Sequence, residues 1–155
     1  MFYIGIDPGK RGGIAIIRDN PEWHEAYPYS DLKLLQVSEM YETDSIVTVE
    51  RVWGMPGQGI SSTFRFGEEY GYIKGVLEAH DIEYYTAPPV TWKALYGLLK
   101  GSKQDSIELA KKLFPDVNLI PEGRRIESDG MAEALLLAEF GRRIRDTARK
   151  NNGTS

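Results

Sequence analysis

Two carboxylates stand inside an apolar stretch near the end of the chain. Asp129 and Glu133 lie four residues apart in SDGMAEALLLAEF, residues 128–140. In a helix this spacing places both side chains on one face. Because a buried carboxylate is unfavourable unless a positive group meets it, the pattern indicates that these two acids face a cation.

Two further acids end predicted strands. Asp7 is the last residue of FYIGID, residues 2–7, and Glu50 is the last residue of SIVTVE, residues 45–50. If these strands are neighbours, their ends lie side by side with the late helix facing them, so four carboxylates converge. Taken singly, each acid has an ordinary explanation as a turn residue, a solvated strand end or a helix cap. The prediction of a common site rests on their joint placement.

The chemistry of such a site follows from its charge. Converging carboxylates repel one another and raise one another's pKa, and divalent cations relieve this repulsion. Oxygen ligands alone favour Mg²⁺ or Mn²⁺. Two such ions about 4 Å apart can activate a water and stabilise the leaving oxygen of a phosphodiester. The sequence therefore predicts metal-assisted hydrolysis, with the four acids as ligands of two ions.

The composition bounds the class of protein. The 155 residues suffice for one α/β domain, placed at residues 1–150 with a flexible tail at 151–155. The lack of cysteine excludes disulfides and thiolate metal sites, and the separation of His24 from His80 argues against a zinc site. With no apolar run near the roughly 20 residues of a membrane span and no recognisable signal peptide, a cytoplasmic protein is expected. The net charge is −4, but the basic residues concentrate in the second half and can form a basic face.

Hydrophobic periodicity and turn residues predict the elements. Strands are predicted at 2–7, 13–18, 22–29, 45–50 and 82–87, and helices at 30–42, 61–79, 88–98, 101–115 and about 129–148. A three-stranded meander followed by alternating helices and parallel strands gives a mixed five-stranded α/β sheet flanked by helices. Gly67, Gly71 and Gly75 recur every four residues in the second helix. They predict a close contact there, either with a second copy of the chain or with the protein's own sheet.

Four segments in this order resemble the RuvC-like Holliday-junction resolvases, in particular compact phage versions, within the RNase H-like superfamily. They are IGIDPGKRGGIAII, VTVERVW, KQDSIELAKKLFP and DGMAEALLLAEF. The resemblance implies an RNase H-like fold and a divalent-metal endonuclease, usually a homodimer, that makes paired nicks near a four-way DNA junction.

The resemblance also assigns the acids. Asp7 and Glu50 match the first two family carboxylates, and Glu133 matches the acid before AL, where bacterial members more often have Asp. The other helix acid of the family stands three residues earlier, whereas Asp129 stands four residues before Glu133. The spacing leaves open which of the two dominates metal binding, and Asp129 is favoured as the direct ligand.

Basic and aromatic residues are predicted to meet DNA. Lys93 and Lys103 match functionally important basic positions of the family, and Lys103 would steady the charge that develops on the phosphate. Trp53 matches an aromatic residue that stacks on an unpaired base, and Gln58 lies in the loop GMPGQG, where it could contact a base edge. The further predicted phosphate contacts are Lys10, Arg11, Lys100 and Ser102. The late arginines could reach the DNA arms or complement a helix C-terminus: Arg124, Arg125, Arg142, Arg143, Arg145 and Arg149.

Two other functions are weighed against a junction-cutting enzyme. GIDPGKRGGIA also resembles the phosphate loop of sugar kinases and actin-like ATPases, but those folds need two such domains, so no nucleotide cofactor is expected. A non-catalytic junction-binding module is the other alternative, and the complete set of acids argues against it. We therefore expect a Mg²⁺-dependent endonuclease, with Mn²⁺ as a substitute, that hydrolyses four-way junctions and other branched DNA without a covalent enzyme intermediate.

Overall fold

One mixed sheet organises the chain. The computed structural model describes residues 1–19 and 22–152, and within them five strands form a sheet in the order β3-β2-β1-β4-β5. The strands are β1 (Phe2–Asp7), β2 (Gly13–Arg18), β3 (Trp23–Pro28), β4 (Ser45–Glu50) and β5 (Tyr84–Ala87). β1, β2 and β3 form an antiparallel meander, whereas β4 pairs in parallel with β1 and β5 in parallel with β4. The predicted meander with added parallel strands is confirmed.

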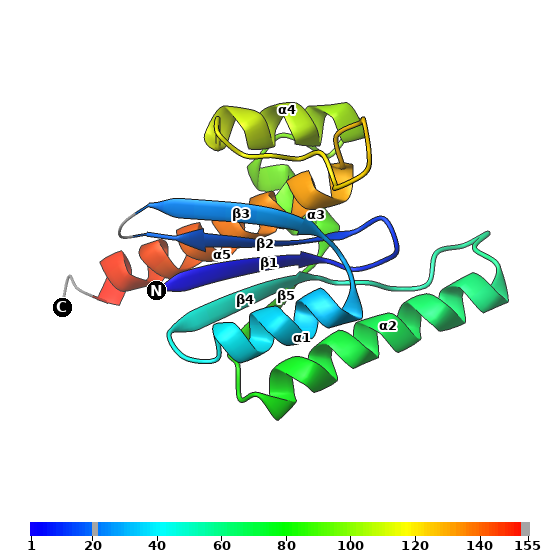
Figure 1. Ribbon diagram of the computed structural model, residues 1–155, viewed down its shortest axis with the longest axis horizontal. Helices are drawn as coiled ribbons and strands as arrows, with labels where there is room; N and C mark the ends of the chain where they lie inside the picture. The colour runs from blue at the N-terminus through cyan, green and yellow to red at the C-terminus, as the bar shows by residue number, and fades with distance from the viewer. Residues whose placement is uncertain (20–21, 153–155) are drawn as a thin grey trace.

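Helices cover both faces of this sheet. They are α1 (Asp31–Met40), α2 (Ile60–Ala79), α3 (Pro89–Leu95), α4 (Lys103–Leu113) and α5 (Asp129–Asn152). Figure 1 shows α5 crossing behind the strands, with α1 and α2 on the opposite side. None of the helices in the described part of the chain has the length and apolar character needed to cross a membrane.

Alternation along the strands builds a separate core on each face, because successive side chains of a strand point to opposite sides. In β1, Tyr3 belongs to the core formed with α3, α4 and α5, whereas Ile4 and Ile6 belong to the core formed with α1 and α2. β4 behaves alike, with Ile46 on the α5 side and Val47 on the α1 side. The odd residues of β1 and the even residues of β4 therefore face α5.

Glycines let α5 lie directly against the sheet. A Cβ atom at Gly5 would fall 1.9 Å from the carbonyl oxygen of Ala134, and one at Gly13 would fall 2.5 Å from that of Gly130. Both distances are shorter than a real Cβ contact, so any side chain at these positions would push the helix away. The first turns of α5 are thereby held at the ends of β1 and β2.

Several predicted boundaries move for local reasons. The strand predicted at 82–87 begins only at Tyr84, because Ile82 donates its N–H to Leu77 in the turn that ends α2 and Asp81 has a left-handed backbone with φ 53°. Helix α5 continues to Asn152, so the first two residues of the predicted tail at 151–155 are helical. Residues 153–155 lie outside the described residues.

The three glycines of α2 face open space. A Cβ atom at Gly67, Gly71 or Gly75 would meet nothing within 4 Å. The alternative that they bring the helix close to its own sheet is therefore wrong. Their role in a contact with a second copy stays a prediction.

Candidate active site

Three carboxylates meet where β1, β4 and α5 come together. Asp7 ends β1 and Glu50 ends the neighbouring parallel strand β4, so both stand at the same edge of the sheet. The alternation along each strand turns both side chains toward α5, whose second turn carries Glu133. One carboxylate oxygen from each of the three residues lies within 4.8 Å of the other two, and all three side chains are half-buried.

Burial and mutual repulsion make this cluster unfavourable without a cation. Burial, followed by the nearby charges of Glu50 and Glu133, raises the pKa of Asp7 well above its usual range, and Lys93 offsets only part of this. Burial also raises the pKa of Glu50, although a hydrogen bond from Trp92 acts in the opposite direction. Three crowded acids, of which Asp7 and Glu50 have raised pKa values, are the arrangement that a divalent cation stabilises.

Buried side chains hold two of the acids in place. The indole Nε1 of Trp92 donates to Oε2 of Glu50 at 2.9 Å, and the hydroxyl of Ser106 donates to Oε1 of Glu133 at 3.1 Å. Trp92 is fully buried and Ser106 is 3% exposed, so neither donor is replaced by solvent. Sequence reasoning missed both residues. The one available signal is that a buried indole N–H needs a partner, which marks Trp92 without saying which acid it meets.

Two lysines accompany the two acids in the first turns of α5, Asp129 and Glu133. Nζ of Lys93 lies 3.2 Å from Oε1 of Glu133, and Nζ of Lys103 lies 2.9 Å from Oδ2 of Asp129. Asp129 stands in the first turn of α5 and is not part of the three-acid group. The geometry thus brings Glu133, rather than the favoured Asp129, next to Asp7 and Glu50.

Comparison with known proteins adds information about the fold. No protein-family model matches the sequence, and no curated protein matches it. Among solved structures, that of Thermus thermophilus RuvC aligns with a TM-score of 0.62 and 17% identity, over 93% of this chain and 96% of that chain. The structure of T. thermophilus RuvC in complex with a Holliday junction substrate aligns with a TM-score of 0.60 and 14% identity over the same shares. The chain has the RuvC-like form of the RNase H-like fold.

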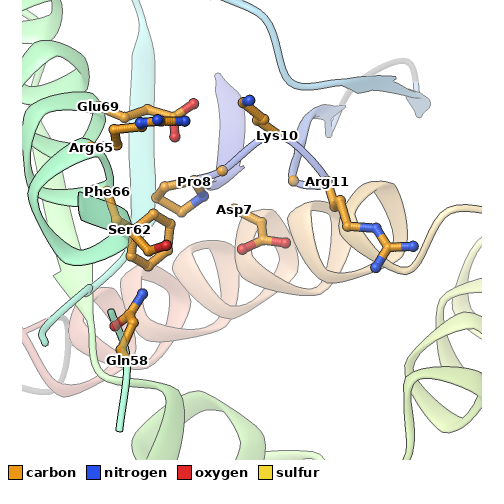
Figure 2. A pocket seen from close by; sticks show the side chains of 11 residues that line it. Asp7, Pro8, Lys10, Arg11, Gln58, Ser62, Arg65, Phe66 and Glu69 are labelled. Carbon is orange, nitrogen blue, oxygen red and sulfur yellow. The ribbon is translucent and has the colours of Figure 1, made fainter. Parts of the chain in front are cut away.

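On this RuvC-like fold, the predicted DNA contacts lie at several places around the acids. Lys10 and Arg11 in the β1–β2 turn, and Gln58 before α2, line a cavity beside Asp7 (Figure 2). Trp53 lies in the loop between β4 and α2 with 48% of its surface exposed. Ser102 caps α4, because its hydroxyl accepts the N–H of Asp105. The exposed Lys100 stands two residues before this cap.

The late arginines of this chain lie in several different environments. Arg142 and Arg143 each lie 2.7 Å from the carboxylate of Glu139, which is 4% exposed. These two arginines neutralise a buried acid. Arg124 instead lines a second cavity together with Arg11 and Asp129, close to the acids. Among the remaining arginines, Arg125 and Arg149 are exposed, and Arg145 contacts Sδ of Met1.

Proposed function

We propose that this chain is a divalent-metal-dependent endonuclease that hydrolyses branched DNA, four-way junctions above all. The observation that carries the proposal is the convergence of Asp7, Glu50 and Glu133, with oxygens within 4.8 Å of one another. The same fold in T. thermophilus RuvC accompanies a Holliday junction substrate, which supports DNA as the substrate class.

The residues present fit a divalent cation. Mg²⁺ binds oxygens at about 2.1 Å, so two oxygens on one ion lie at most about 4.2 Å apart, and the three acids need to close only slightly. Asp7, Glu50 and Glu133 would hold the cation, and Asp129 would contribute to a second one. Mg²⁺, or Mn²⁺ in its place, suits an all-carboxylate set. When bound, it would activate water for attack on phosphorus and stabilise the leaving oxygen.

The chain's own groups would position the DNA. Lys103 is 68% exposed on its side chain, so it can move from Asp129 to a phosphate and stabilise charge that develops there. Lys93 lies deeper, beside Glu133, where it would meet the phosphate nearest the acids. We also assign Trp53 to stacking on a base and Gln58 to a base edge. We also propose that DNA phosphates farther from the acids are contacted by Lys10, Arg11, Lys100 and Ser102.

A homodimer would supply two acid groups for paired cuts. The open glycine face of α2 allows a second helix to approach closely, and Phe64 on the same helix is 66% exposed. Figure 1 shows α2 at the outer side of the molecule. A two-fold contact through this face would match the two-fold symmetry of a four-way junction.

The direct test is a synthetic four-way junction incubated with Mg²⁺. The wild-type protein should cut it, and Asp7→Asn should bind it without cutting. Glu42→Gln is the matched control, since it makes the same charge change at an exposed acid before β4, at the opposite end of the sheet from the site. If the wild type binds the junction and leaves it intact in Mg²⁺ and in Mn²⁺, the enzyme proposal is wrong and the binding-module alternative holds.

A further inference from the structure

A cavity of about 600 Å³ opens beside Asp7, on the side of the acid group that faces α2. The β1–β2 turn forms one wall, and the loop before α2 and the first turns of α2 form the other. Figure 2 shows Asp7 at the boundary of this cavity, with Gln58 and residues of α2 opposite the turn. Its volume lies within the range of about 300–1,000 Å³ that is typical of small-molecule sites.

Phe66 provides a flat apolar wall. Its ring is half-buried and lies close to the turn after Asp7, since a Cβ atom at Gly9 would stand 3.3 Å from Cε2 of Phe66. Gly9 also has φ +119°, a backbone that favours glycine, so the turn is built to lie near the ring. Pro8 and Phe66 both line the cavity, and in Figure 2 Gln58 points toward Phe66. An aromatic ring with a polar amide nearby suits a nucleobase, which stacks through its face and hydrogen-bonds through its edge.

Cations surround this wall. Lys10, Arg11 and Arg65 all line the cavity, and among the residues that the structure describes Arg11 and Arg65 form no ion pair. Glu69 also lines it, and the charge of Lys10 and the backbone of Gly9 partly offset the rise that burial causes in the pKa of its carboxyl. The cavity therefore offers two guanidinium groups without an ion-pair partner among the described residues, the kind of group that binds phosphate well.

We propose that this cavity holds one unstacked nucleotide of the DNA strand adjacent to the scissile phosphate, with its base on Phe66 and its phosphate near Arg65. The inference rests on the proposed function. Asp7 belongs both to the acid group and to the cavity, so the nucleotide that enters would be a direct neighbour of the cut. A free mononucleotide presents the same chemistry. DNA is favoured because the cavity opens onto the acids that would cut its backbone.

An abasic scan tests the stacking. Single bases are removed, one at a time, on both sides of the junction centre, and affinity is measured with Ca²⁺ in place of Mg²⁺ to slow cutting. At one position, loss of the base should weaken binding to the wild type by about 5- to 150-fold, as expected for one base–aromatic stack. Phe66→Leu keeps an apolar side chain without a π-face. It should bind the intact junction as weakly as the wild type binds the abasic one, and removal of the base should then change nothing.

The controls separate this site from the proposed function. Tyr85→Ala removes an exposed aromatic residue of β5, outside the cavity, and should match the wild type. If Phe66→Leu shows the same base-dependent loss as the wild type, the nucleotide site is wrong while cutting by the wild type still supports the endonuclease. Binding of AMP or ATP without DNA, lost in Phe66→Leu, would overturn DNA as the source. If the wild type neither binds nor cuts the junction, both proposals fail.

Discussion

Asp7, Glu50 and Glu133 come from three distant parts of the chain, and each depends on a neighbour for its position. Trp92 binds Glu50 across 42 positions of sequence, and Ser106 binds Glu133 across 27. In both cases the donor occupies one oxygen of the carboxylate and leaves the other oxygen for a ligand. Partners of this kind orient metal ligands and commonly change metal affinity when they are removed.

Trp92→Phe tests whether the hydrogen bond from Trp92 orients Glu50 for metal binding. The change keeps an aromatic side chain in the core but removes the N–H that reaches Glu50. We expect Mn²⁺ affinity, measured by calorimetry without DNA, to fall by about 10- to 100-fold. Ser106→Ala should give a smaller loss, because Lys93 still meets Glu133. Since Trp92 is fully buried, thermal unfolding of each variant shows whether the fold is kept, and an unchanged Mn²⁺ affinity in a folded variant would contradict the assigned role.

Asp129 and Glu133, the two acids in the first turns of α5, should differ in their importance for cutting. Glu133→Gln removes a member of the three-acid group and should abolish detectable cutting of a four-way junction. Asp129→Asn removes the partner of Lys103 and should lower the cutting rate by about 10- to 100-fold at limiting Mg²⁺, with recovery at high Mg²⁺. The reverse order of the two variants would restore Asp129 as the direct ligand.

At the scale of elements, alternation and glycine placement decide what the strands and helices present. The ends of β1 and β4 are readable from the sequence, and parallel pairing of these strands brings Asp7 and Glu50 to one edge. The rotation of α5 about its axis is not readable, because it depends on the contacts of Gly5 and Gly13 with the helix backbone. That rotation decides whether Glu133 or Asp129 faces the strand ends. The Trp92–Glu50 hydrogen bond escapes prediction for the same reason, since it depends on how α3 packs.

Gly5→Ala tests whether the close packing of α5 against β1 depends on the lack of a side chain at this position. The new methyl group would stand 1.9 Å from the carbonyl oxygen of Ala134, and neither backbone can move without separating α5 from β1. We expect a loss of about 1–3 kcal/mol in the free energy of unfolding, measured by urea denaturation, together with weaker Mn²⁺ binding. Gly59→Ala, at a position where a Cβ atom meets nothing within 4 Å, is the control. A fully stable Gly5→Ala would show that the helix can shift at little cost.

At the scale of the whole molecule, association and charge set how the site works. If two copies meet through α2, Gly71→Arg should halve the mass measured by light scattering, because a long charged side chain would enter the close contact. The monomer should then nick junctions one strand at a time. Glu42→Arg, at an exposed position before β4, introduces the same side chain elsewhere and should leave the mass unchanged. A dimer that persists in Gly71→Arg would move the interface away from this face.

The repulsion among the acids should make the stability of the folded protein depend on pH. Burial and neighbouring acids raise the pKa of Asp7 and Glu50 in the folded chain, so folded protein keeps protons there after the unfolded chain has released them near pH 4. In EDTA, stability should therefore fall as pH rises from about 4 through the folded pKa values and stay low above them. Asp7→Asn removes the largest part of this penalty and should raise Tm at pH 7, by about 2–4 °C for each kcal/mol gained.

Mg²⁺ at 100 times its Kd should stabilise the wild type by about 2.7 kcal/mol and Asp7→Asn by less, because an amide binds the ion more weakly than a carboxylate. Differential scanning calorimetry with and without Mg²⁺ measures both effects, and a wild type that is equally stable in EDTA and in Mg²⁺ would mean that these acids meet no cation.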